Sequence, residues 1–88
     1  MKAIILTQAT CPNCDSQKLF MKAAFGDKLD GKVEFIKKED NEELFWDWIQ
    51  KAEVMSTPST LFVENDEIIE TVIGFNPGIL KGAIEKYL

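Results

Sequence analysis

Both cysteines of the chain fall in one short segment, Cys11-Pro12-Asn13-Cys14, which closely follows an apolar run. The run, residues 2–7, is short and rich in β-branched side chains, as a buried strand is. Proline suits the first helical position, because the amide that it lacks has no helical partner there. The segment therefore predicts a strand that leads into a helix over residues 12–25, with Cys11 as the N-cap and Cys14 one turn inside.

The rest of the chain continues this alternation of strands and helices. We expect a glycine-framed loop at 26–31, strands at 33–37, 60–64 and 67–73, a second helix capped by Asp40 or Asn41 and running to about residue 52, and a last helix from Pro77. The strand–helix–strand start implies parallel pairing with a right-handed crossover. Asn65-Asp66 suits a two-residue hairpin loop and implies an antiparallel pair. Residues 1–88 are therefore predicted to form one α/β domain of order βαβ-α-ββ-α, with a four-stranded mixed sheet flanked by three helices.

Helical spacing also predicts which side chains face the core. Three apolar faces follow from it: Ser16, Leu19, Phe20, Ala23 and Ala24 on the first helix; Leu44, Phe45, Trp48, Ile49 and Ala52 on the second; and Ile79, Leu80, Ala83, Ile84 and Leu88 on the third. Trp46 points away from its helix's apolar face, either as a partner contact or as a cover for one end of the core.

The charge balance excludes several functions. The net charge is −5, with ten lysines, no arginine and no histidine. Nucleic-acid binding needs a basic face, and the lack of histidine rules out Cys–His and Ser–His couples. No apolar run approaches the roughly 20 residues of a membrane span, and the N-terminal one is shorter than the about 7–15 residues of a secretory signal core. We expect a cytoplasmic monomer that binds neither nucleic acid nor membrane.

The position of Cys11 suits nucleophilic chemistry. The thiolate is the reactive form of cysteine, and a free thiol with a pKa of about 8.5 is mostly protonated near neutral pH. The amides of Asn13 and Cys14 and the positive end of the helix dipole should lower the pKa of the Cys11 thiol. We predict that Cys11 attacks a substrate disulfide and that the more shielded Cys14 resolves the mixed disulfide.

Three other interpretations of the cysteine pair stay open. A structural disulfide three residues apart would constrain little of the unfolded chain. A zinc site would need four ligands and therefore two chains, and we assign no metal. Two inert core cysteines fit poorly with Pro12 and Asn13 between them.

Three segments in the right order make the chain similar to the thioredoxin–glutaredoxin superfamily. Thr10-Cys11-Pro12-Asn13-Cys14 resembles the TCPYC motif of glutaredoxins. Ser56-Thr57-Pro58-Ser59-Thr60 comes where the superfamily carries a cis-proline, and Gly74-Phe75-Asn76-Pro77 resembles the GFRP segment of small redoxins that serve ribonucleotide reductase. The resemblance implies the thioredoxin fold and a dithiol–disulfide oxidoreductase with Cys11 and Cys14 as catalytic residues.

The resemblance also implies substrate-binding residues. The peptide group before the cis-proline hydrogen-bonds the substrate backbone in the family, a role that falls here to Thr57 and Pro58. Without the resemblance, the sequence favours a strand-start proline at Pro58, because few X-Pro bonds are cis.

Four more residues complete the substrate site implied by the resemblance: Pro12, Asn13, Gly74 and Phe75. Gly74 either allows a close backbone approach beside the active site or is an ordinary turn glycine. Phe75 is either a partner contact or a lid on the core.

Departures from the family pattern leave the electron source open. Residues 3–6 lack the buried aspartate of thioredoxins, and Gln8-Ala9-Thr10 lacks the basic residue with which glutaredoxins hold glutathione. We expect no bound cofactor, with electrons from a flavoprotein reductase using NADPH or from glutathione. The clients are protein disulfides, with ribonucleotide reductase as a candidate. The alternatives are a glutathione-dependent glutaredoxin and a redox-silent binding module of thioredoxin fold.

Overall fold

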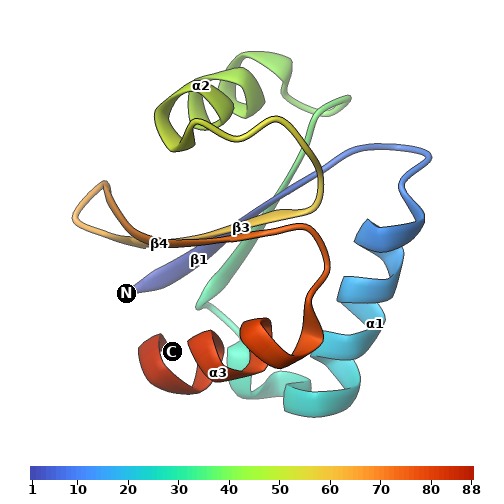
Figure 1. Ribbon diagram of the computed structural model, residues 1–88, viewed down its shortest axis with the longest axis vertical. Coiled ribbons are helices and arrows are strands. Elements are labelled where there is room, and N and C mark those ends of the chain that lie inside the picture. Colours follow the sequence, from blue (N-terminus) through green and yellow to red (C-terminus); the bar gives the residue numbers. More distant parts are fainter.

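The computed structural model describes all residues, 1–88, and its helices and strands follow the predicted order (Figure 1). The strands are β1 (Lys2–Thr7), β2 (Val33–Lys37), β3 (Ser59–Glu64) and β4 (Glu67–Ile73), and the helices are α1 (Pro12–Phe25), α2 (Glu42–Ala52) and α3 (Pro77–Tyr87). The expected loop after α1 begins instead with a short 3-10 helix, η1 (Gly26–Leu29).

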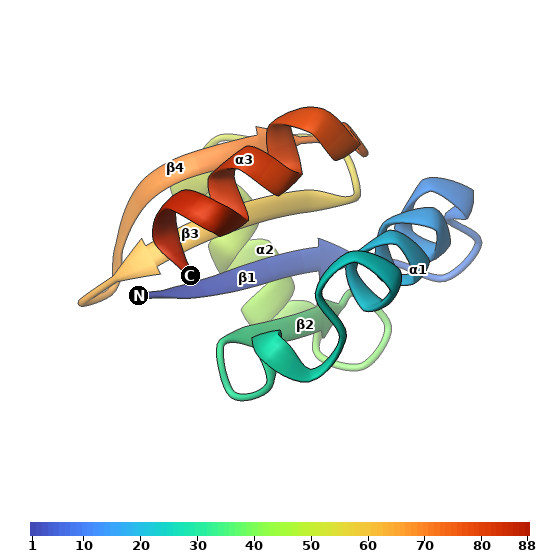
Figure 2. The ribbon, with the colours of Figure 1, turned by 90° about the horizontal axis from the view of Figure 1, so that it is seen from below.

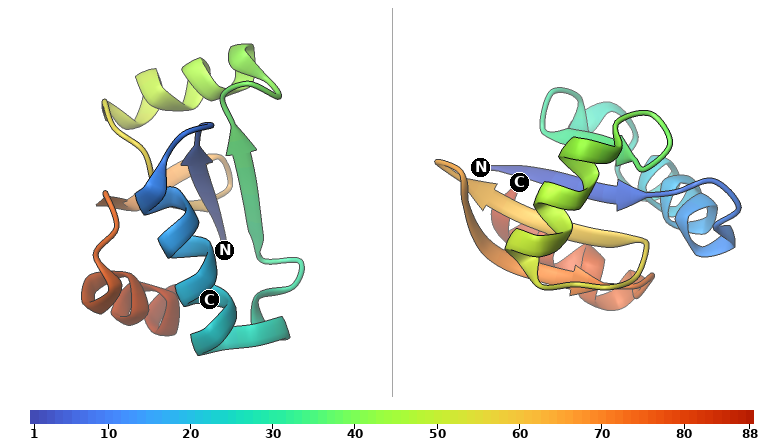
Figure 3. Two further views of the ribbon diagram at one scale, coloured as in Figure 1. Left: turned by 90° about the vertical axis from the view of Figure 1, so that its right-hand side faces the viewer. Right: turned by 90° about the horizontal axis from the view of Figure 1, so that it is seen from above.

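The four strands form one mixed sheet in the order β2-β1-β3-β4. The pairing of β1 with β2 is parallel, and β3 is antiparallel to both β1 and β4, which confirms the predicted arrangement. Helices α1 and α3 cover one face of the sheet, and α2 crosses the other (Figure 3). Both termini lie at the end of the sheet opposite the loop that enters α1 (Figure 2). None of the helices has the length and apolar character needed to cross a membrane.

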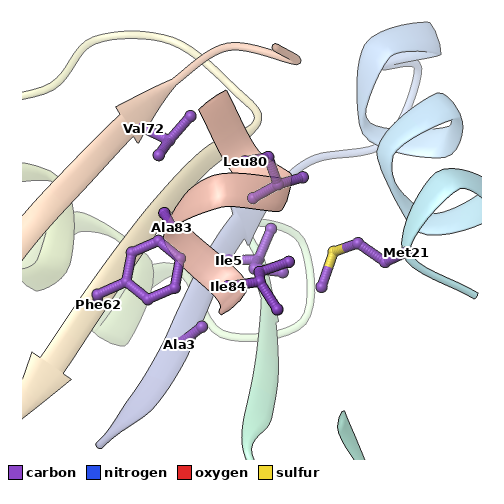
Figure 4. Packing of buried hydrophobic residues seen from close by; sticks show 8 residues of the cluster. All are labelled: Ala3, Ile5, Met21, Phe62, Val72, Leu80, Ala83 and Ile84. Atoms are coloured by element: carbon purple, nitrogen blue, oxygen red, sulfur yellow. The ribbon is translucent and has the colours of Figure 1, made fainter. Parts of the chain in front are cut away.

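Two buried clusters hold the layers together, one on each face of the sheet. The cluster beneath α1 and α3 contains Ala3, Ile5, Met21, Phe62, Val72, Leu80, Ala83 and Ile84 (Figure 4). The cluster beneath α2 contains Ile4, Leu6, Ile36, Phe45, Val54, Leu61 and Val63. Successive strand residues point to opposite faces, so the central strands β1 and β3 supply both clusters.

The buried face of α1 differs from the predicted one. Leu19 is 70% exposed, and Ser16, Ala23 and Ala24 are exposed as well, whereas Phe20 is half-buried. The buried residues of the helix are Cys14, Gln17 and Met21. Cys14 faces the sheet, and positions three and seven residues later share its side of a helix. The buried face of α1 is therefore the one that carries Cys14, Gln17 and Met21, and the predicted apolar face is wrong.

The other two helices confirm most of their predicted faces. Phe45 is buried and Trp48 packs against the α2 cluster, and Trp46 is 45% exposed. The prediction fails for Leu44, which is exposed. On α3 the prediction fails only for Ile79, which is exposed.

The predicted turn and caps are present. Asn65 and Asp66 both have positive φ, 51° and 65°, as the favoured two-residue hairpin turn requires. Asn41 caps α2 by accepting the amide of Leu44 at 3.1 Å, which decides between the two candidate caps.

Candidate functional site

Cys11 and Cys14 form a disulfide at the start of α1, with their Cα atoms 5.2 Å apart. Cys11 is the N-cap in an extended conformation, Pro12 is the first helical residue, and the Cys14 amide donates a hydrogen bond to Cys11 Sγ at 3.2 Å. Both cysteines are buried, Cys14 more deeply. In the reduced protein, the same amide and the start of the helix would face a Cys11 thiolate and stabilise it.

The segment before β3 lies directly against this disulfide. The carbonyl oxygen and the Oγ1 atom of Thr57 are 3.7 and 3.6 Å from Cys11 Sγ, although the two residues are 46 positions apart. The peptide bond between Thr57 and Pro58 is cis, and Pro58 is fully buried. The fold therefore brings together Cys11, Thr57 and Pro58, as the family resemblance implies.

Gly74 and Phe75 lie at the end of β4. The Gly74 amide donates to the Pro58 carbonyl at 2.8 Å and its φ is +74°. A Cβ atom there would meet nothing within 4 Å, so glycine serves the left-handed conformation rather than a close approach. The half-buried Phe75 ring packs edge-on against Phe20 of α1, with ring centres 6.0 Å apart. Phe75 therefore contacts α1 through Phe20, which itself packs against the core.

An open groove of about 600 Å³ lies beside Cys11, the less buried half of the disulfide. Its lining residues are Gln8, Thr10, Cys11, Pro12, Asn13, Met55, Ser56 and Thr57. The exposed Met55 was missed by the sequence analysis, although it directly precedes the Ser-Thr-Pro segment. No side chain that lines the groove carries a charge.

The groove continues toward α2. A smaller pocket of about 90 Å³ shares four of the groove's residues and adds Trp46 and Lys38. The Lys38 ammonium lies 5.3 Å from the centre of the Trp46 ring. The one charged side chain of the combined surface is therefore a cation at the end remote from Cys11.

Glu39 holds the loop that enters the site. Its carboxylate accepts the Ala9 amide at 2.9 Å, and this hydrogen bond is the main reason that the pKa of Glu39 is lowered. Thr10, which follows Ala9, has φ +55°, a conformation that β-branched residues rarely adopt.

We expect the Ala9–Glu39 hydrogen bond to be lost in acid. Because the pKa of Glu39 is lower in the folded than in the unfolded state, its stabilisation is complete above the unfolded value of about 4.3 and disappears as pH falls through the folded value. In an NMR titration, the Ala9 amide shift should follow the Glu39 carboxylate. That dependence should vanish in Glu39→Gln and survive in the control Asp40→Asn; an unchanged titration in Glu39→Gln would contradict the assignment.

The described chain offers no metal centre of its own. No group of three or more His, Cys, Asp or Glu side chains is placed to hold a metal ion, and both cysteines are joined in the disulfide.

Comparisons with known proteins bear on the fold. No protein-family model matches the sequence, and a search of curated proteins gives no match. Among solved structures, a Plasmodium falciparum thioredoxin is 25% identical, with 99% of this chain and 85% of that chain aligned and a TM-score of 0.72. An Aeropyrum pernix thioredoxin is 22% identical, with 98% of this chain and 74% of that chain aligned and a TM-score of 0.74. A Malassezia sympodialis thioredoxin is also 22% identical, with 97% of this chain and 72% of that chain aligned and a TM-score of 0.73.

Proposed function

Because this chain has the thioredoxin fold, we propose that it is a dithiol–disulfide oxidoreductase that reduces disulfides in other proteins. The observation that carries the proposal is the Cys11–Cys14 disulfide at the start of α1, with the Cys14 amide bonded to the Cys11 sulfur. Proteins of one fold can have many different functions, so the proposal depends on this site rather than on the similarity to solved thioredoxin structures alone.

In the first step the Cys11 thiolate attacks one sulfur of the substrate disulfide. A mixed disulfide forms, and the second substrate sulfur leaves as a thiolate that takes a proton from solvent. The Cys14 amide supports the attacking charge. The Thr57 backbone, 3.7 Å from the Cys11 sulfur, would bind the substrate chain beside its cystine, and Met55 and the pocket at Trp46 would extend that surface.

In the second step Cys14 attacks the Cys11 sulfur. The new bond is the Cys11–Cys14 disulfide, and the electron pair of the broken mixed disulfide leaves with the substrate sulfur, which becomes a thiol. Two electrons and two protons have then passed to the substrate. The structure holds the oxidised product of this cycle, and no bound cofactor is required for the exchange.

A flavoprotein reductase that uses NADPH is the electron source that the groove favours. Glutathione carries two carboxylates, and none of the residues that line the groove at Cys11 carries a charge; Lys38 is the one cation that lines the adjoining pocket. Ribonucleotide reductase is a candidate client on the resemblance of residues 74–77. We also propose that the protein is cytoplasmic and monomeric.

Insulin reduction tests the electron source. We expect turnover with thioredoxin reductase and NADPH, and little with glutathione and glutathione reductase. The reverse result would favour the glutaredoxin alternative. Glutathione binding should then depend on Lys38, so Lys38→Ala should raise the KM for glutathione, whereas the control Lys37→Ala should not. Absence of turnover with both reductants would support the redox-silent binding module.

A further inference from the structure

A small polar layer lies buried between α1 and the sheet. Gln17 and Thr7 are 1% and 2% exposed, and the Gln17 amide nitrogen donates to Thr60 Oγ1 at 2.7 Å. Gln17 Oε1 and Thr7 Oγ1 have no hydrogen-bond partner in the protein. Buried polar atoms are almost always paired, to protein or to ordered water, so two such oxygens in one layer call for an explanation.

Gln17, which carries one of these oxygens, shares the buried face of α1 with Cys14. Gln17 follows Cys14 by three positions, so both lie on the buried face of α1. Side chains on a helix lean toward its N-terminus and cover the preceding turn, which here carries Cys14. Figure 4 shows Met21, one turn further along the same face, pointing toward Ile5 of β1.

The strand register puts Thr7 on the same face of the sheet as Thr60, the hydrogen-bond partner of Gln17. Thr60 is directly opposite Ile5, and Thr7 lies two residues beyond Ile5 on the same face. Such diagonal neighbours are about 7–8 Å apart, and the Gln17 amide is bound to Thr60 on this face. Extended by one pair, the same register sets Thr7 beside Pro58, under the Cys11 site.

No carboxylate is available in this layer. The buried polar residues of the chain are Thr7, Gln17, Ser59 and Thr60, with no Asp or Glu among them. The Cys14 thiol must nevertheless lose its proton to resolve a mixed disulfide. A buried water bound by two to four polar groups is a common structural element, and two orphan oxygens supply such partners.

We propose that Thr7 Oγ1 and Gln17 Oε1 hold one internal water beneath Cys14, and that this water takes the proton from the Cys14 thiol in the resolving step. The inference rests on the proposed function. The Cys14 S–H bond breaks, the Cys14–Cys11 bond forms, and the electron pair of the mixed disulfide departs on the substrate sulfur. The water passes the proton to that leaving thiolate or to solvent. Gln17 and Thr7 are positioning residues, since they act through the water.

The two steps can be timed separately with 5,5′-dithiobis(2-nitrobenzoate) and the reduced full chain. Attack by Cys11 releases one coloured thiolate, and resolution by Cys14 releases the second. Thr7→Val and Gln17→Met remove one oxygen each and should slow the second phase about tenfold, less than the roughly 10²–10⁴-fold of a positioned acid or base, without changing the first phase. The double variant should be no slower than either single one, because both bind the same water.

Three further variants separate this role from packing. Met21→Leu alters the same buried face of α1 without a polar change and should leave the second phase unchanged. Thr7→Ser keeps the hydroxyl and should retain the fast second phase. Gln17→Glu should add an inflection to the pH profile of the second phase, since a buried carboxyl has a raised pKa, whereas the unaltered layer contains no titrating group.

The proposal is overturned if the second phase is unchanged in both single variants, if their effects multiply in the double variant, or if Met21→Leu slows it equally. Loss of the fast phase in Thr7→Ser would also overturn it, because that variant keeps the oxygen. Thermal unfolding of each variant establishes that the folded protein is being compared. If the unaltered chain showed no first phase, the proposed function would fail instead.

Discussion

Replacing Cys11 with serine is expected to abolish disulfide reduction, whereas replacing Cys14 with serine should stop the reaction at a stable mixed disulfide. A serine hydroxyl is not an effective nucleophile without an activating base, and the chain has no histidine. In Cys14→Ser the first attack still proceeds, because Cys11 keeps its place at the start of α1 and a backbone amide aimed at its sulfur. The trapped substrate then has no second thiol to release it.

Insulin turnover and mass spectrometry of the trapped species measure these outcomes. Cys11→Ser should fall to the rate of a protein-free control, and Cys14→Ser should carry one substrate chain on Cys11. Ser16→Ala, an exposed change on the same helix, is the control and should leave turnover unaltered. Activity retained in Cys11→Ser, or a trapped substrate in that variant instead, would reverse the assignment of the two cysteines.

Leu80→Ala should strongly destabilise the folded protein. Leu80, a residue of α3, is 0% exposed and belongs to the same buried cluster as Ile84 and Phe62 (Figure 4). Truncation of a buried leucine costs about 2–5 kcal/mol, a large share of the roughly 5–15 kcal/mol that stabilise a domain. The neighbouring Ile79 is 57% exposed, so Ile79→Ala should change the free energy of unfolding by no more than about 0.5 kcal/mol.

Urea denaturation of the two variants provides the comparison. The midpoint should fall strongly for Leu80→Ala and hardly at all for Ile79→Ala, with similar slopes. Equal losses would mean that the buried face of α3 is misassigned. Under conditions where Leu80→Ala is folded, its reaction at Cys11 should be unchanged, because Leu80 is not part of the groove.

The element order and the reactive pair were predictable because their signals are local. Pro12 marks the start of α1, and Asn65-Asp66 marks the hairpin, each through its own backbone preference. Such signals are carried by a few adjacent residues and do not depend on the rest of the fold.

The rotation of α1 could not be predicted from its apolar pattern. Leu19, Phe20 and Met21 point in different directions around the helix, so the pattern does not select one face. The structure buries Met21 and exposes Leu19, and Met21 shares the buried face of α1 with Cys14. The error also concealed Gln17, a polar residue on the true buried face.

The contacts that refine the site were beyond sequence reasoning for a different reason. Gln17 meets Thr60 across 43 positions, and Glu39 meets Ala9 across 30. Each is a tertiary hydrogen bond between a common polar side chain and a distant group. Only the family resemblance placed Thr57 and Pro58 beside Cys11, and no resemblance pointed to Gln17 or Glu39.

Equilibration of the full chain with glutathione buffers, followed by acid quenching and thiol counting, tests the central claim most directly. A dithiol–disulfide couple predicts that Cys11 and Cys14 are oxidised together in one two-electron transition, with a tenfold change in the equilibrium constant for each 29.6 mV or so. The glutaredoxin-like motif without glutathione-binding charges predicts a midpoint between about −270 mV, typical of thioredoxin, and about −230 to −200 mV, typical of glutaredoxins. Two thiols that remain reduced across the whole range, or that react independently with glutathione, would contradict the claim.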